Sequence, residues 1–294
     1  MMLALTRPRG FDPSYFDSEL ALLREDRQRI LLVVGSYYEA EVVGETLAEL
    51  LAELRQPPYG EEVLTLIPDS EGEGDDTWQP PAGKLPRSLL NHLPKRPARF
   101  LVAPLQAIER GHNILVGQEA AIGSVYFLVR PYPVPGDIHT AINKVNAWAM
   151  DYVHTLIQPE ATLAGKQLRE DAAREWDKAL GGGKKYKELG DGSGDNESDE
   201  RTPLLWTQFV LVWQCIGRLL RGGVSARVHF VDARWAENSP KGLNDTEQTS
   251  MLLGFRRILR AALADRDPAR QAIAEALYGE AARAFEQIEG VYHV

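Results

Sequence analysis

Short runs dominated by Val, Ile, Leu and Phe alternate along the chain with longer segments whose apolar residues recur every three or four positions. The short runs are Arg29–Val34, Val63–Ile67, Ala98–Val102, Ser124–Val129 and Ala226–Val231. Continuous apolar runs are typical of strands that are buried on both faces of a parallel sheet. The longer segments, which predict helices, are Glu39–Arg55, Asp137–Ile157, Leu163–Leu180 and Leu204–Leu220. Strands alternating with helices predict an α/β fold with a mainly parallel sheet.

The pattern changes character after Asp232, where only helical periodicity remains. Met251–Leu263 and Gln271–Ile288 both read as amphipathic helices. We therefore expect an α/β domain over residues 1–240 and a helical extension over residues 241–294.

One segment of the first domain is poor in apolar residues. Residues 181–202 are rich in Gly, Lys, Asp and Glu, and they are predicted to form a disordered linker because they bury too little apolar surface to offset the cost of ordering. The whole chain of 294 residues carries a net charge of −9, so any nucleic-acid surface has to be local. The only cysteine, Cys215, excludes an internal disulfide and a cluster held by several cysteines. No leader peptide or long apolar span is evident, and a cytoplasmic location is expected.

The most informative polar positions lie in the apolar run 204–221, which predicts a buried helix. Gln214, Gly217, Arg218 and Arg221 are spaced at offsets of 0, 3, 4 and 7, so they share one face of that helix. Two buried guanidiniums require an anion opposite them, and the planar Arg fork matches phosphate oxygens. The stripe therefore fits either a phosphate site or a structural ion pair at a helix end.

The pattern Q-x-x-G-R-x-x-R at Gln214–Arg221 resembles the last signature motif of superfamily 2 helicases, and further segments resemble the DinG/XPD-type members in the same order along the chain. These segments are Arg29–Tyr37, Ile108–Ile114, Ser124–Asp137 and Arg227–Arg234. Together they cover about residues 29 to 234 and are similar to the second, C-terminal RecA-like domain of such a motor. One departure is Asn113, which stands where the fifth motif commonly has an acidic residue.

A motor of this class also needs a phosphate-binding loop of the form G-x-x-x-x-G-K-[ST]. The chain has none: Lys84, Lys166 and Lys184 each follow a glycine, but none precedes Ser or Thr. We therefore expect the chain alone to lack ATPase activity. The resemblance implies that ATP and Mg²⁺ are bound mainly by a separate N-terminal RecA-like domain or subunit.

The resemblance also implies roles for individual residues. Arg218 and Arg221 would act catalytically as arginine fingers on the γ-phosphate. Gln214, Gly217, Gly111 and Asn113 would lie at the ATP, and Ser36 and Arg110 would contact DNA. By the same resemblance, the expected setting is bacterial DNA processing or phage defence.

Two alternatives remain open at this point. The chain could be a non-catalytic interaction or scaffold subunit that kept the fold of a helicase domain and lost the motor. It could also be a fragment of a longer protein that includes the missing half. No His or Cys spacing typical of a metal site is present, so no metal ligand set is predicted.

Overall fold

The structure, a computed structural model, describes most of the chain. The described residues are 1–54, 62–69, 80–108, 113–130, 145–146, 148–150, 152, 161–179, 186–193 and 199–291. Every structural statement below concerns these residues.

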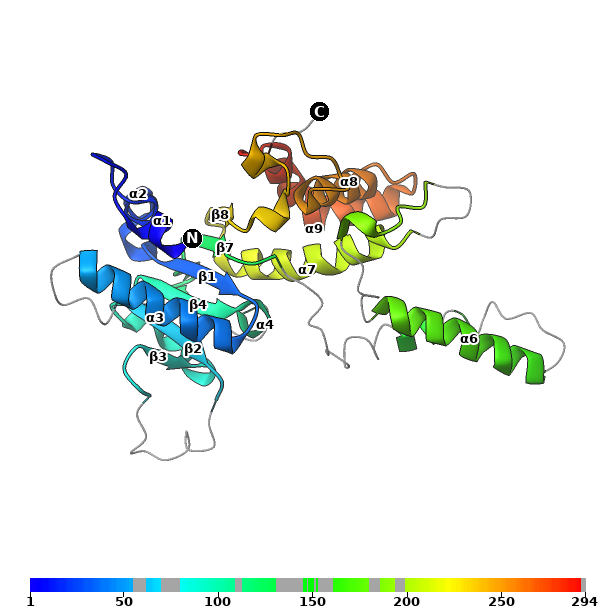
Figure 1. The fold of residues 1–294 in the computed structure, drawn as a ribbon, viewed down its shortest axis with the longest axis horizontal. Helices are drawn as coiled ribbons and strands as arrows, with labels where there is room; N and C mark the ends of the chain where they lie inside the picture. Colours follow the sequence, from blue (N-terminus) through cyan, green and yellow to red (C-terminus); the bar gives the residue numbers. More distant parts are fainter. Residues whose placement is uncertain are drawn as a thin grey trace.

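A six-stranded sheet with the order β3-β2-β4-β1-β7-β8 forms the centre of the molecule (Figure 1). The strands are β1 Ile30–Val34, β2 Val63–Ile67, β3 Lys84–Pro86, β4 Phe100–Pro104, β7 Ser124–Phe127 and β8 Arg227–Phe230. All neighbouring pairs in this sheet are parallel. The strands therefore all begin at one edge, called here the amino edge, and all end at the opposite, carboxyl edge.

Helices cover both faces of the sheet, which gives a three-layer arrangement. The first face packs against α1 Met2–Thr6, α2 Tyr15–Leu22 and α3 Tyr37–Leu54, and the second against α4 Leu105–Ile108, the 3₁₀ segment η2 Arg87–Lys95 and α7 Arg201–Leu219. Because side chains alternate along a strand, Ile30, Leu32 and Val34 face the first layer. Leu31 and Val33 face the second. The expected α/β fold with a mainly parallel sheet is thus confirmed.

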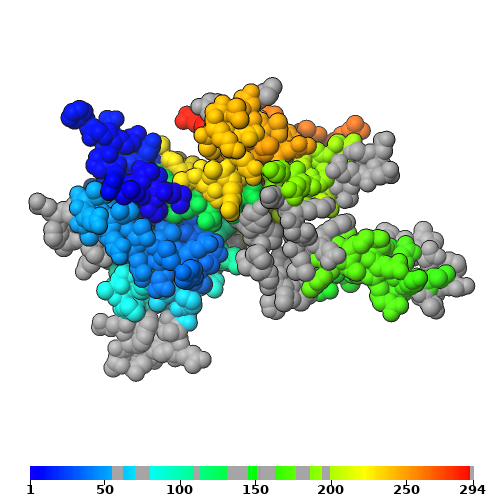
Figure 2. Space-filling view, viewed as in Figure 1, coloured from blue at the N-terminus to red at the C-terminus, as the bar shows by residue number. Residues whose placement is uncertain are grey.

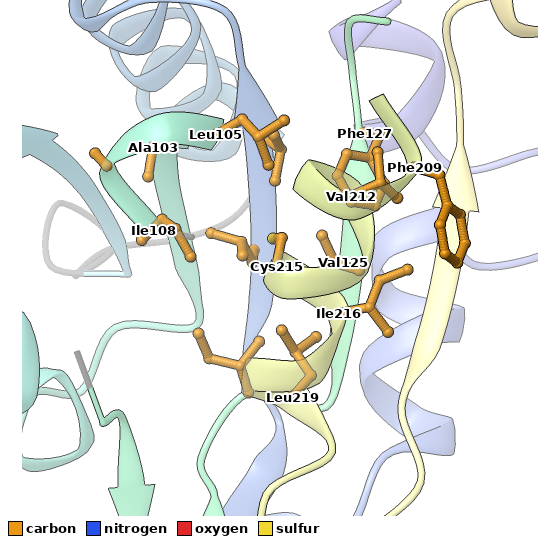
Figure 3. Close-up of a cluster of buried hydrophobic side chains, with 14 of the residues drawn as sticks. Ala103, Leu105, Ile108, Val125, Phe127, Phe209, Val212, Cys215, Ile216 and Leu219 are labelled. Atoms are coloured by element: carbon orange, nitrogen blue, oxygen red, sulfur yellow. The ribbon is translucent and has the colours of Figure 1, made fainter. Parts of the chain in front are cut away.

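Helix α7 packs lengthwise on the second face. Its residues Val212, Cys215 and Leu219 are buried and face the sheet and α4 (Figure 3). The buried ring of Phe209 points away from α4 and lies in an aromatic cluster with Phe255, Tyr278 and Phe285. The helix then leads directly into β8, as the sequence pattern predicts. The helix is not buried all round, however: Gln214 is exposed and Gly217, Arg218 and Arg221 are only partly buried, which matters for the polar stripe.

The C-terminal helices form the region that the sequence predicts. α8 Met251–Leu263 and α9 Pro268–Glu286 pack together, and α8 also packs on α7 (Figure 1). The 3₁₀ segments η4 Ala233–Trp235 and η5 Ser239–Lys241 precede them. In this connecting loop the buried carboxylate of Asp245 accepts hydrogen bonds from the backbone N–H groups of Asn238 and Ser239 and from both the Ser239 and Thr249 hydroxyls.

Helix α6 Ala161–Ala179 matches the predicted helix Leu163–Leu180 within two residues. It stands apart from the sheet and from the helices that cover it (Figures 1 and 2). The predicted helix Asp137–Ile157 lies largely outside the described residues. Within the described part of the chain, no helix combines the length and the apolar character that crossing a membrane requires.

Several elements were not predicted from the sequence. These are the short helices α1 and α2, the edge strand β3, the 3₁₀ segment η1 Glu25–Arg27, and an antiparallel hairpin of β5 Leu115–Val116 and β6 Glu119–Ala120. They are too short to show a clear period.

The predicted linker 181–202 is also not uniformly a linker. Residues 186–193 are ordered around η3 Tyr186–Glu188, and Tyr186 is buried with its hydroxyl donating to the Glu247 carbonyl. Composition alone missed this because a single buried aromatic residue fixes the segment.

Candidate functional site

The C-terminal end of α7 lies at the amino edge of the sheet, because α7 runs antiparallel to the strands before it leads into β8. The backbone N–H of Ala120, in the β5–β6 hairpin, donates to the carbonyl of Arg221 at 2.9 Å. Gly222 follows with φ of +82°, and a Cβ there would lie 2.7 Å from the Gln118 carbonyl oxygen. Only glycine fits this turn, both in backbone conformation and in space.

Two members of the predicted stripe, Gln214 and Gly217, lie on the outer side of α7. Gln214 is exposed, and no atom lies within 4 Å of a Cβ built on Gly217. The expectation of a buried stripe was therefore wrong for Gln214. The apolar run misled because Trp206, Val210 and Trp213 are only partly buried on the same helix.

Arg218 and Arg221 are both half-buried at this end of the helix. Burial lowers the pKa of the Arg218 guanidinium below its ordinary value, and the positive charge of Arg221 lowers it further. Among the residues the structure describes, Arg221 forms no ion pair. The Glu119 side chain passes next to Gly222, yet its carboxylate pairs with Arg24 instead. Two like charges are thus held close together, an arrangement that an anion would stabilise.

The end of α7 is fixed by an arginine that the sequence did not single out. Arg27 in η1 is buried, and its guanidinium donates to the carbonyls of Ala120, Ile122, Leu219 and Ser225 at 2.6–2.9 Å. These acceptors are distant in sequence, so no local motif marks Arg27.

Ser36 lies at the opposite, carboxyl edge. It follows β1 directly and caps α3, because its hydroxyl accepts from the Glu39 N–H at 3.1 Å and its carbonyl accepts from the Ala40 N–H. The Glu39 carboxylate in turn accepts from the Gly35 N–H at 2.7 Å. Ser36 is exposed, but its hydroxyl already has this structural role.

Asn113, for which the resemblance implies a place at the ATP, does not lie at the carboxyl edge with Ser36. It precedes the β5–β6 hairpin, and its N–H donates to the Asn91 side chain at 3.0 Å. The next residue, Ile114, accepts from Ala121, so the hairpin connects Asn113 to the Arg221 turn. Asn113 is exposed on this side of the molecule. Arg110 and Gly111 lie outside the described residues.

A second charged cluster, which the sequence did not indicate, joins α2 to β8. The buried carboxylate of Glu19 bonds to Arg227 Nε at 2.9 Å and to His229 Nε2 at 3.0 Å. Burial alone would raise the pKa of Glu19, but these hydrogen bonds outweigh it and lower that pKa to about 2. The His229 ring also stacks on Tyr126, with 4.2 Å between the ring centroids. The charged groups of this cluster are paired with one another, so we assign it the structural role of holding α2 against β8.

Among the described residues, no group of three or more His, Cys, Asp or Glu side chains is arranged to hold a metal ion. Comparisons of the chain with known protein families, curated proteins and solved structures found no match. The candidate site therefore consists of the α7 end, with Gln214, Gly217, Arg218 and Arg221, and the adjoining hairpin that begins at Asn113.

Proposed function

We propose that this chain is the C-terminal RecA-like half of a DinG/XPD-type, DNA-dependent ATPase, and that it supplies arginine fingers to a nucleotide bound by another domain. The observation that supports this most is the Arg218–Arg221 pair at the end of α7. The two side chains are three positions apart and both half-buried, and no carboxylate within the described structure pairs with Arg221.

The chemistry of the pair fits a phosphoryl-transfer reaction. Negative charge spreads over the γ-phosphate oxygens in the transition state, and preorganised guanidinium groups stabilise it. The open space beside Gly217 and the exposure of Gln214 leave room for a second domain to approach this side of α7. ATP and Mg²⁺ belong in this scheme to the partner domain, which carries the phosphate-binding loop.

The proposal is tested by reconstitution. The chain alone is expected to hydrolyse no ATP, and a mixture with the N-terminal motor domain of a DinG-type helicase is expected to hydrolyse it when DNA is present. Arg218→Ala or Arg221→Ala should reduce turnover by about 10³–10⁵-fold. Full activity in both variants, or ATP hydrolysis by the unmixed wild-type chain, would contradict the proposal.

An interaction subunit without catalytic function is the second candidate. It is favoured by α9, where Ile273 and Leu277, one helical turn apart, are 60% and 55% exposed. Exposed apolar neighbours of this kind occur at protein interfaces. A complex that forms with the motor domain, needs Ile273 and Leu277, and is indifferent to Arg218 and Arg221 would favour this candidate over the first.

A further inference from the structure

The guanidinium of Arg27 is buried at the amino edge of the sheet and is surrounded by backbone carbonyls. Arg27 is only 7% exposed. Its Nε donates to Ala120 at 2.7 Å, its Nη1 to Ser225 at 2.6 Å, and its Nη2 to both Ile122 and Leu219 at 2.9 Å. Arginine has five N–H donors in a fixed plane, so this set uses most of its bonding capacity.

The acceptors belong to three separate segments of the chain. Ala120 and Ile122 lead from the hairpin into β7, Leu219 is the last residue of α7, and Ser225 lies in the turn before β8. The rigid guanidinium of Arg27 therefore connects the end of α7, by hydrogen bonds, to the hairpin and to the turn before β8. It also satisfies the Leu219 carbonyl, one of those that the end of a helix otherwise leaves without a partner.

Leu219 stands between the two arginines of the candidate site. It is the residue after Arg218 and lies two positions before Arg221. The Arg221 carbonyl is bound by the Ala120 N–H, while the Ala120 carbonyl is bound by Arg27. The backbone around Arg218 and Arg221 is thus fixed through Arg27. Arg27 is 192 residues away from Leu219 in the sequence.

We propose that Arg27 is the positioning residue of the Arg218–Arg221 pair. It places the end of α7 so that both guanidiniums point to one anion, and it does so without introducing a carboxylate that would compete for them. The proposal rests on the proposed function for its effect on turnover, whereas the fixing of the α7 end is measurable without any ATPase activity. Arginine is required because lysine offers three donors from a single point and cannot span four carbonyls in a plane.

The test compares Arg27→Lys with the matched control Arg29→Lys. Arg29 is also partly buried and donates to two carbonyls, those of Asp26 and Pro94, but neither lies on α7, the hairpin or the turn before β8. Amide hydrogen exchange of the full chain is measured for residues 215–226 and, as an internal reference, for α8 and α9. Turnover and the KM for ATP are measured in the mixture with the motor domain.

Arg27→Lys is expected to speed amide exchange at residues 215–226 while α8 and α9 keep their protection. Arg29→Lys is expected to leave the exchange rates of residues 215–226, α8 and α9 unchanged. In the active mixture, Arg27→Lys should lower kcat by about 10–100-fold, since small displacements of a catalytic group have effects of this size. The KM for ATP should stay within about twofold, because the nucleotide is bound mainly by the other domain.

The outcomes separate the two claims. Faster exchange at 215–226 together with an inactive wild-type mixture would leave the positioning role standing and overturn the proposed function. An active mixture that loses turnover in Arg221→Ala, but keeps both its turnover and its exchange protection in Arg27→Lys, would overturn the positioning role alone.

A measurement on the unmodified chain covers the case in which Arg27→Lys does not fold. The Arg27 Nε–H proton, observed by nitrogen-15 NMR, is expected to exchange with water far more slowly than the Nε–H of an exposed arginine such as Arg270. Rapid exchange of the Arg27 proton in the folded wild type would overturn the proposal.

Discussion

Arginine residues lie at both ends of helix α7, but the surroundings of their guanidinium groups differ. At the first end, Arg201 is 3% exposed and pairs with Asp191 at 3.3 Å, donates to the Leu189 carbonyl and lies against the Tyr186 ring. At the last end, Arg218 and Arg221 are half-buried beside each other, and Arg221 has no carboxylate partner in the described structure. Arg201 shows what a structural ion pair looks like in this protein. Arg221 at the other end has no such carboxylate among the described residues, which favours an external anion there.

The contrast is sharpest in stability. Arg201→Ala should lower the free energy of unfolding by about 2–3 kcal/mol, because it removes a buried guanidinium that hydrogen-bonds to the Leu189 carbonyl and to the partly exposed Asp191 carboxylate. Arg221→Ala should change it by less than about 0.5 kcal/mol, as expected for a partly exposed side chain without a protein partner. Urea unfolding of both variants measures the difference. Equal losses would show that Arg221 has a structural partner after all.

Arg227 is also paired with a carboxylate, that of Glu19, and this pair should make the stability of the fold depend on pH. Glu19 ordinarily has a pKa of 4.5 and in the folded protein about 2, so it stabilises the fold fully above about pH 4.5. This contribution, about 3 kcal/mol, is lost as the pH falls from 4.5 towards 2. Glu19→Gln should therefore be less stable than wild type at pH 7, and the gap between them should close in acid. A gap that stays constant down to pH 2.5 would mean that Arg227 and His229 do not act on this carboxylate.

Anions should distinguish the two ends of α7 directly. Pyrophosphate is expected to bind Arg218 and Arg221 and so raise the Tm of the wild-type chain. When its concentration is ten times its dissociation constant, the free energy of unfolding should increase by about 1.4 kcal/mol. The gain should disappear in Arg218→Ala/Arg221→Ala. Arg257→Ala, which removes an arginine already paired with Glu247 at 3.1 Å, is the control that should keep the gain. The same rise in the double variant would place the anion elsewhere.

The smallest expected effect concerns two glycines. Gly217→Ala should stabilise the chain by about 0.5–1 kcal/mol, because alanine favours the helix and the space around Gly217 is open. Gly254→Ala in α8 should destabilise it, since a Cβ there would lie 2.5 Å from the Tyr186 hydroxyl and 2.7 Å from Leu205. If Gly217→Ala destabilises the isolated chain, the open side of α7 is in fact covered.

Much of the fold was predictable because it depends on local periodicity. The continuous apolar runs identify five of the sheet strands, and the predicted helix Leu204–Leu220 is found as α7 directly before β8. The site was only partly predictable. The spacing of Gln214, Gly217, Arg218 and Arg221 gives one helix face, but it does not tell whether that face is buried, since partly exposed Trp206 and Trp213 make the helix look apolar all round.

The remaining features depend on contacts between distant parts of the chain. Arg27 is an ordinary charged loop residue in sequence, and only folding brings Leu219 and Ser225 to its guanidinium. Ser36 shows the reverse case, because its motif-like position after β1 coincides with a helix cap that explains its hydroxyl without any ligand. Local sequence patterns therefore identify candidates, while partners in space decide between structural and functional roles.

The most direct test of the account is a comparison of nucleotide states in the complex with the N-terminal motor domain of a DinG-type helicase. The affinity of the chain for that domain is measured with ADP and with ADP–aluminium fluoride, which mimics the transferring phosphoryl group. For wild type we predict tighter association with the aluminium fluoride state, because Arg218 and Arg221 then contact the added charge. In Arg218→Ala/Arg221→Ala the two states should bind equally. The same preference for aluminium fluoride in wild type and double variant would contradict the claim that this end of α7 supplies arginine fingers.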